Sequence, residues 1–322
     1  MRPLHAAALM VTTFVSFIHA PLAAAQAWPA KPVRLIVNSA AGASVDLIAR
    51  AFSQRLGATL GQPIIVDNRA GGGGTIGIRD VAKAPADGYT LLHSAGSLFV
   101  FGSHMKGLDF DIATEVEPIA TTARNTILLV ARPDLGANNV ADLMAMARAN
   151  PGKLNFGSGS LGLQAATEMM LLAAKVRATN VPYKSVAQMV TDLVGGQIDF
   201  ALEPGTSIAH AKAGKLRLLA AVSSVRSSAL PDLPTLAQAG VEADAGTITV
   251  IGLYGPAKLP GDIAARLNAE VGKIMQTPEA RSVLSGIGSD PINLTPTEFS
   301  AMLRRDRDRY GAVIREANIR IE

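Results

Sequence analysis

Apolar residues along this chain alternate between short β-branched runs and longer stretches of helical spacing. Val33–Val37 (VRLIV) has the continuous apolar pattern of a buried strand, and Val45–Leu60 repeats apolar residues at the period of a helix. The same alternation predicts strands at Ile64–Asp67 and Tyr89–His93 and a helix near Thr75–Ala84.

The alternation of strand and helix patterns resumes near residue 127. It predicts strands at Ile127–Ala131, Leu154–Phe156, Ile198–Leu202, Leu216–Val222 and Thr247–Tyr254. Strands that alternate with helices indicate an α/β layered sheet, here in two similar lobes. A chain that ends in helices can return to complete the first lobe, although periodicity alone does not prove that return. The predicted helices are Val140–Ala149, Gln164–Val176, Lys184–Val194, Gly261–Gln276, Pro278–Gly286 and Pro296–Glu316.

The first 25 residues have the pattern of a signal peptide. Arg2 is followed by a short apolar run, Ala6–Ile18, and by the small residues Ala23–Ala25 before Gln26. The run is too short for a membrane-spanning helix, which needs roughly 20 apolar residues. We therefore predict an exported, soluble chain that starts near Gln26; the alternative is a buried N-terminal helix.

Composition removes several classes of chemistry. The chain has 322 residues and no cysteine, which excludes thiol catalysis, cysteine-ligated zinc and iron–sulfur clusters. Its formal net charge of +4 is mild, and the densest basic segment, Arg304–Arg309 (RRDRDR), interleaves acids as a solvated helix face does. We expect no nucleic-acid partner. The histidines beyond the signal segment lack a zinc-binding spacing, so we expect no metal.

Two glycine-rich turns nominally match the dinucleotide fingerprint. The first is Gly157, Gly159 and Gly162 within LNFGSGSLGLQ. A dinucleotide site also wants an acidic residue about 20 positions further on to hold the ribose hydroxyl. The corresponding segment, Arg177–Ser185, contains none. In the second match, at Gly72, Gly74 and Gly77, the acidic candidate Asp87 falls in a turn. We therefore expect no cofactor.

A glycine turn that opens a helix serves another purpose equally well. Its backbone N–H groups lack intrahelical partners, and the helix dipole adds partial positive charge, so a carboxylate is accommodated there. The segment SAAGASVD, with Gly42 and Ser44, has the same design. One such terminus from each lobe would clamp a small anion between them. The alternative is that these are ordinary helix starts capped by Ser44, Ser158 and Ser160.

The ordered set of motifs resembles the Bug family, the TctC-like solute-binding receptors of tripartite tricarboxylate transporters. The resemblance covers nearly the whole mature chain. It rests on VDNRAGGGGTIG, KAPADGYTLL, ANPGKLNFGSGS, VPYKSVAQMVTDLVGGQIDFALE and LPGDIAARLNAEVGKIM, in that order.

The resemblance implies a type II periplasmic-binding-protein fold, in which two Rossmann-like lobes flank a ligand cleft. The first lobe would comprise residues 26–126 and 250–322, and the second residues 127–249. Such a protein is a periplasmic, non-catalytic receptor that closes around a small organic acid. We expect a monomer that delivers this anionic ligand to membrane transporter subunits.

The family's ligand positions fall on loops at the ends of predicted strands. For three of them a structural role is an alternative to ligand binding. Asp46 could simply stabilise its helix start, Tyr183 could be a solvated residue at the rim of the cleft, and Glu203 could form a hinge hydrogen bond. The positions carried over are Ala41, Gly42, Ala43, Ser44 and Asp46; Ser94, Gly96 and Ser97; Ser158, Gly159, Ser160, Gly162 and Gln164; and Tyr183 and Glu203.

Departures from the family pattern concern the loops that hold the ligand. The first loop reads NSAAGA where the family usually has PFPPGG, and Gln164 replaces a common histidine. We therefore expect the distal end of the ligand to differ from that of well-known members. A sensory co-receptor, a binding module without a transport partner and an exported hydrolase remain alternatives, although the chain has no G-x-S-x-G nucleophile motif.

Overall fold

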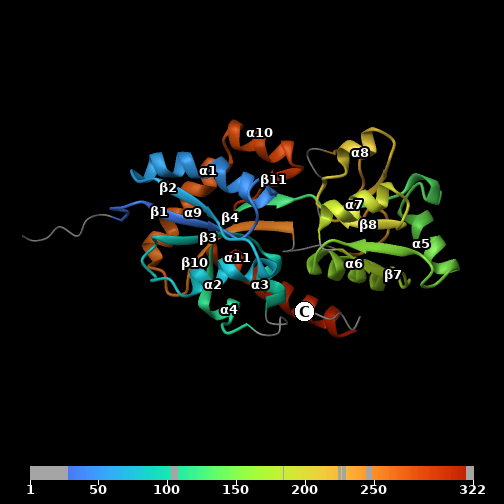
Figure 1. Ribbon diagram of the computed structural model, residues 1–322, viewed down its shortest axis with the longest axis horizontal. Helices are drawn as coiled ribbons and strands as arrows, with labels where there is room; N and C mark the ends of the chain where they lie inside the picture. Colours follow the sequence, from blue (N-terminus) through green and yellow to red (C-terminus); the bar gives the residue numbers. More distant parts are fainter. Residues whose placement is uncertain are drawn as a thin grey trace, which may run out of the picture.

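A computed structural model of the chain describes residues 28–102, 108–183, 185–223, 226, 230–243 and 249–316. The predicted signal peptide, residues 1–25, lies outside this part of the chain. The described residues form two α/β lobes that lie side by side along the long axis of the molecule (Figure 1). Each lobe is built around its own β-sheet.

The sheet of the first lobe has six strands in the order β11-β4-β10-β3-β1-β2. β1 pairs in parallel with β2 and β3, whereas β10 runs antiparallel to both β3 and β4. Strands from both ends of the chain therefore share one sheet. The bounds are β1 Val33–Val37, β2 Ile64–Asn68, β3 Thr90–Ala95, β4 Val116–Asn125, β10 Val250–Pro256 and β11 Ser289–Pro291.

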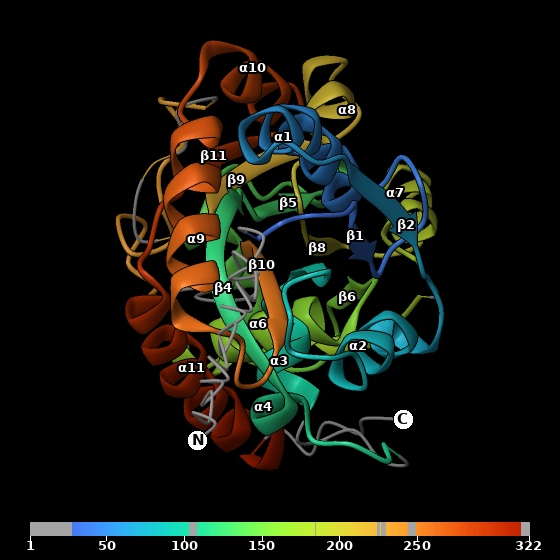
Figure 2. The same ribbon diagram turned by 90° about the vertical axis from the view of Figure 1, so that its left-hand side faces the viewer.

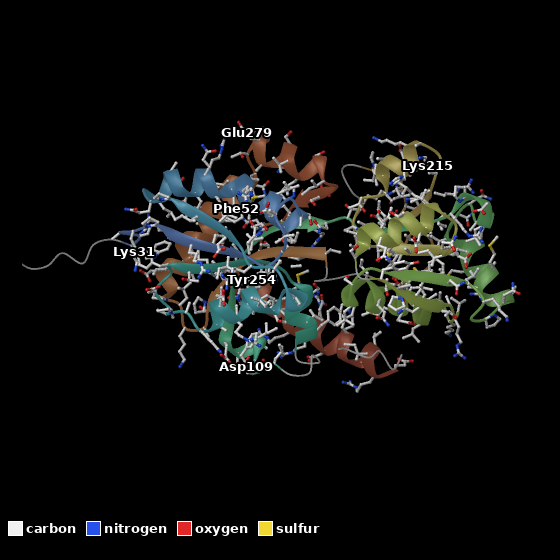
Figure 3. All side chains as sticks on the ribbon, viewed as in Figure 1. Lys31, Phe52, Asp109, Lys215, Tyr254 and Glu279 are labelled. Carbon is white, nitrogen blue, oxygen red and sulfur yellow. The ribbon has the colours of Figure 1, made fainter. Side chains whose placement is uncertain are left out.

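Helices cover both faces of this sheet (Figure 2). α1 (Ser44–Leu60), α9 (Gly261–Met275) and α10 (Pro278–Gly286) bury their apolar stripes on one face. Phe52 lies in that layer and Tyr254 lies in the opposite one (Figure 3). The opposite layer is formed by α2 (Thr75–Ala82), α3 (Ser97–Phe101), α4 (Ile112–Glu115) and α11 (Pro296–Glu316).

The sheet of the second lobe has the order β7-β6-β8-β5-β9 and repeats the plan of the first. β6 pairs in parallel with β7 and β8, and β5 is antiparallel to β8 and β9. The strands are β5 Leu128–Ala131, β6 Asn155–Ser158, β7 Thr179–Pro182, β8 Phe200–Glu203 and β9 Arg217–Ala221; the helices are α5 Val140–Ala149, α6 Leu161–Ala173, α7 Val186–Val194 and α8 Ile208–Lys212.

Helix α11 joins the two lobes. Its first half contributes Phe299 and Leu303 to a core of the first lobe. Its second half contributes Tyr310 to the core that also holds α6 of the second lobe, and Phe101 from α3 packs edge-on against the Tyr310 ring with the centroids 5.3 Å apart. Figure 1 shows α11 running from beneath the first lobe toward the second.

Strand β4 has no counterpart in the predicted elements. It is ten residues long, yet its segment VEPIATTARN does not alternate apolar and polar residues. The register against β10 shifts at two points, which places extra residues in β4 and breaks the period of two. The short elements α3, α4, α8, β7 and β11 were also not predicted.

Buried polar side chains of this lobe fix the segment that leads into α11. Thr121, fully buried on β4, donates to the Ile292 carbonyl at 2.9 Å and accepts from the Leu294 N–H at 2.8 Å. Asn268 on α9 donates to the carbonyls of Ile119 and Leu294, each at 2.9 Å. These bonds hold the start of α11 against the first sheet.

Replacing Thr121 with valine tests this anchor. Valine keeps the volume but removes both hydrogen bonds, so the half-buried Leu294 N–H and Ile292 carbonyl lose this partner. We expect the free energy of unfolding to fall by about 1–3 kcal/mol, measured by urea denaturation. Thr59→Val removes an exposed hydroxyl on α1 whose bond to the Arg55 carbonyl water can replace, and should change stability by less than about 0.5 kcal/mol. Equal effects of the two substitutions would contradict the anchor.

Candidate functional site

A cleft of about 730 Å³ lies between the lobes, within the size range of small-molecule sites. Its lining combines hydroxyl and amide side chains with apolar ones, and none of the described lining residues is charged. The first lobe contributes Asn38, Ser39, Ser44, Val45, Gly74, Ala95, Ser97, Leu98, Phe101, Asn125 and Ile251. The second contributes Ile127, Ser158, Gly159, Ser160, Leu161, Gly162, Leu163, Gln164, Pro182, Tyr183, Val186 and Pro204.

The loop between β1 and α1 delivers a free helix terminus to the cleft. Gly42 has φ +83°, a left-handed conformation that glycine adopts readily, and Ala43 is extended at the N-cap position of α1. Because alanine has no side-chain acceptor, the first N–H groups of this 17-residue helix are left without a side-chain cap. Ser44 and Val45, in that first turn, line the cleft.

Asp46 holds this loop from behind and does not line the cleft. Its carboxylate, only 2% exposed, accepts from the Gly42 N–H at 2.9 Å, from Arg50 Nε at 3.0 Å and from Asn68 Nδ2 at 2.9 Å. Burial by itself would raise the pKa of Asp46, but the hydrogen bonds from Arg50, Gly42 and Asn68 outweigh it and hold the pKa below its usual value. Asp46 is therefore a positioning residue for the helix start.

The loop after β3 meets the β1 loop inside the first lobe. Asn38 Nδ2 donates to Ser94 Oγ at 3.0 Å and to the Gly74 carbonyl at 3.4 Å. Ser94 is fully buried and lies behind Asn38, whereas Ser97, at the start of α3, reaches the cleft. The Gly96 N–H is taken by the Val250 carbonyl at 2.8 Å.

In the second lobe the β6–α6 loop forms the facing wall. Gly159 has no room for a side chain, because a Cβ there would approach the backbone of Val186 to 2.7 Å. Ser160 caps α6 by accepting from the Leu163 N–H at 3.3 Å, and Ser158 donates to Asn180 Oδ1 at 2.7 Å. Gly162 and Gln164, in the first turn of α6, also line the cleft.

Tyr183 closes this wall with its ring. Its N–H donates to the Ser158 carbonyl at 2.8 Å, which fixes the residue after β7. Burial and the hydrogen bond to the Asp192 carboxylate raise the pKa of the Tyr183 hydroxyl. Tyr183 lines the cleft, where its ring can supply apolar surface and its hydroxyl a polar group.

Glu203, at the end of β8, is fully buried and lies outside the lining. Its carboxylate accepts from Thr206 Oγ1 at 2.7 Å, Ser207 Oγ at 2.5 Å and the Ser207 N–H at 3.2 Å. These bonds shape the turn that places Pro204 against the cleft. Glu203 thus fixes a loop in the second lobe as Asp46 does in the first.

Asn125 lies where the chain leaves the first lobe for the second. It ends β4, and its Oδ1 accepts from Ser289 Oγ at 2.7 Å. Asn125 also lines the cleft, and its side-chain nitrogen is a group that can donate to a ligand there. The pattern gave no signal for this residue because β4 itself was not predicted.

Eight of the fifteen residues taken from the family pattern line the cleft: Ser44, Ser97, Ser158, Gly159, Ser160, Gly162, Gln164 and Tyr183. Ala41, Gly42, Ala43, Asp46, Ser94, Gly96 and Glu203 do not. Asn38 and Ser39 were missed, although their position directly after β1 is a signal that could have found them, because ligands meet the carboxyl ends of parallel strands. Within the described ranges, no three His, Asp or Glu side chains converge as metal ligands would.

Comparison with known proteins identifies the family. The model of the tripartite tricarboxylate transporter family receptor, TctC, matches residues 48–319. This chain belongs to that family. The predicted relationship to Bug and TctC-like receptors is therefore confirmed.

Relatives of this TctC-family chain match it nearly end to end. BugT of Bordetella pertussis is 32% identical over 310 residues, covering 95% of this chain and 94% of BugT. A UPF0065 protein in the tcbD-tcbE intergenic region of Pseudomonas sp. (strain P51) is 32% identical over 293 residues, covering 90% and 87%.

Solved structures confirm the expected two-lobed α/β fold class. A periplasmic transporter has a TM-score of 0.76 at 31% identity, and an R. palustris protein with adipate has 0.76 at 30%; each match covers 92% of this chain and 100% of the other. BugD has 0.73 at 25% identity, with the same coverage. Among the described residues of this TctC-family chain, no helix is both long and apolar enough to cross a membrane.

His93 lies under the cleft of this TctC-family chain rather than in its lining. It is fully buried on β3, where Nδ1 donates to the Val45 carbonyl at 3.0 Å and Nε2 lies 2.9 Å from Thr122 Oγ1. Burial lowers the pKa of His93 to about 3, against the opposing influence of the Val45 carbonyl and Asp46. The ring is therefore neutral at neutral pH and supports the first turn of α1.

Replacing Asp46 with asparagine should loosen the β1–α1 loop. The carboxamide keeps the size, but its NH₂ group faces donors, so we expect a loss of about 1–3 kcal/mol in the free energy of unfolding at pH 7. Because the folded pKa is lowered, the contribution of Asp46 is complete above the ordinary aspartate pKa of 3.8 and disappears as the pH falls through the folded pKa. Urea denaturation between pH 7 and 3 measures both. Asp232→Asn, at an exposed position, is the control; a loss as large in that variant would refute the role of Asp46.

Burial of neutral His93 should make stability depend on pH. The unfolded chain binds a proton near pH 6.5, whereas folded His93 does so near 3, so wild-type stability falls as the pH drops from 6.5 toward 3. The limiting slope is about 1.4 kcal/mol per pH unit. His93→Gln should lose this component of the slope. In a proton NMR titration the His93 ring signals should stay constant from pH 8 to 5, and a midpoint near 6.5 would overturn the assignment.

Proposed function

We propose that the protein is an exported, periplasmic solute-binding receptor that captures a small organic acid between its lobes. The observation that carries the proposal is the uncapped N-terminus of α1 at the cleft, where backbone N–H groups and the helix dipole favour a carboxylate. The relative solved with adipate supports this ligand class.

Further hydrogen-bond donors stand around that terminus. Ser44 and Ser97 present hydroxyls from the first lobe, Asn125 presents its amide nitrogen from the crossing segment, and Gln164 faces them from the second lobe. An anion that contacts both lobes binds the closed arrangement better than the open one and so shifts the equilibrium toward closure. No covalent step is part of this function.

Membership of the family supports a transporter as the delivery partner. We propose that the chain acts as a monomer and hands its ligand to the membrane subunits of a tripartite tricarboxylate transporter. The lobes would comprise residues 26–126 with 250–322, and 127–249. Restored acid uptake in a strain that lacks only this receptor tests the delivery step.

Thermal-shift screening of the chain without residues 1–25 tests the receptor role directly. The probes are small mono-, di- and tricarboxylates, each paired with its amide. An acid at 100 times its dissociation constant should add about 2.7 kcal/mol of stability, and its amide should add much less. Stabilisation by amides alone would contradict an anion site.

A charge placed at residue 44 tests the α1 terminus as the anchor. Ser44→Asp puts a carboxylate in the first helical turn, where it suits the dipole and should leave the fold intact or slightly stabilised. It should repel the carboxylate of the ligand and weaken acid binding on the order of 100-fold in calorimetry, because like charges in contact cost several kcal/mol. Ser44→Asn, of equal size and no charge, should weaken binding far less. Equal losses of affinity in the two variants would show that the ligand carboxylate is bound at another place in the cleft.

A further inference from the structure

The two walls of the cleft differ in what they offer a ligand. The first lobe brings the uncapped terminus of α1, Ser44 and Ser97. The second lobe brings mostly apolar side chains, among them Leu161, Leu163 and Val186. The first wall also holds apolar side chains, among them Leu98, Phe101 and Ile251, but it is the wall with the uncapped helix terminus.

Two hydroxyls of the second-lobe wall already have partners in the protein. Ser158 donates to Asn180 Oδ1, and the Ser160 hydroxyl oxygen caps α6, which leaves the Ser160 proton to donate. Helix α7, whose first residue Val186 belongs to this wall, has its own cap, since Ser185 accepts from the Gln188 N–H at 3.3 Å. This capping contrasts with the bare Ala43 at α1.

A buried, unpaired donor marks the first lobe as the anion end independently of the helix. Ser39 Oγ is shielded from solvent and lacks a hydrogen-bond partner, although Ser39 lines the cleft. A hydroxyl in that state gains a partner when a carboxylate enters beside it. Gln164, which is neutral, is the second-lobe counterpart and suits an uncharged polar group.

The charge of the lining residues limits which chemical group the other end of the ligand can carry. None of the described lining residues is Lys, Arg or His, so a second carboxylate pressed against Leu161 and Leu163 would lose its hydration without gaining a cation. An aromatic ring or branched alkyl group placed there would instead be buried favourably against leucine, valine and the Tyr183 ring.

We infer that the cleft selects monocarboxylic acids whose other end is apolar and uncharged, such as aromatic or branched aliphatic acids, over di- and tricarboxylic acids. The inference rests on the proposed receptor function and narrows its ligand class. Leu161, Leu163 and Val186 are its specificity-determining residues, and the α1 terminus with Ser39 is its anion end.

Matched pairs of acids test the selection on the wild-type protein without residues 1–25. Isothermal titration calorimetry compares 4-methylbenzoate with terephthalate, and heptanoate with pimelate, which differ by one carboxylate at similar length. At least one monocarboxylate should bind 30-fold or more tighter than its dicarboxylate partner. Equal or tighter binding of the dicarboxylates overturns the inference but leaves the receptor function intact. Failure of all four acids and of the wider carboxylate panel overturns both.

Inverting the selectivity provides a second, independent measurement. Leu161→Arg puts a cation on the partly exposed first turn of α6, facing the cleft. Dicarboxylate affinity should rise at least 10-fold relative to that of the matched monocarboxylate. The control Leu172→Arg adds the same charge to the same helix at a side chain that is 37% exposed and outside the lining, and should leave the ratio unchanged. An unchanged ratio in folded Leu161→Arg would count against the wall assignment.

Discussion

Parallel pairing of three strands in each lobe determines where the cleft lies. In β2-β1-β3 and in β7-β6-β8 the carboxyl ends point to one edge of the sheet, and the chain must turn there to enter a helix. The turns after β1, β3, β6, β7 and β8 all contribute lining residues, because in both lobes that edge faces the other lobe. Backbone N–H groups at the helix starts are thereby gathered between the lobes, where none of the described lining residues is charged.

Acidic side chains lie behind these turns and outside the described cleft lining, where they hold the turns in place. Asp46 and Glu203 each bury a carboxylate that accepts three or more hydrogen bonds from its own loop and neighbours. A buried carboxylate with this many donors holds its loop in one conformation, because moving any one donor away leaves a buried acceptor unsatisfied. The cleft surface can then consist of neutral groups whose positions are fixed from below. This division accounts for the family-pattern residues that lie outside the lining.

The spacing of apolar residues predicted the helices and strands whose sequence keeps a helical or strand repeat throughout. It failed for elements in which that repeat is interrupted or too short. The helices α1, α6 and α9 and the strands β1 and β5 carry clear apolar repeats. β4 was missed because its two bulges and Pro118 remove the alternation, and α3 because five residues are too few for a helical repeat. The same failures hid Asn125 and Phe101 from the predicted site. Asn38 was missed for a different reason. It belongs to no motif, but it directly follows β1, and ligands commonly bind at the carboxyl ends of parallel strands.

Helix α11 constrains how the proposed receptor could close. Phe299 is packed in the first lobe and Tyr310 in the core of the second, so the edge formed by α3 and α11 keeps its contacts while the lobes rotate. The lobes also meet near Gly205 and Gly288, where the Thr126 N–H donates to the Gly288 carbonyl at 3.0 Å. In the proposed closure, rotation about the α3–α11 edge would carry the β6–α6 wall toward the start of α1. That wall and the α1 terminus would then contact the same ligand, so that their difference in chemistry would act on selectivity.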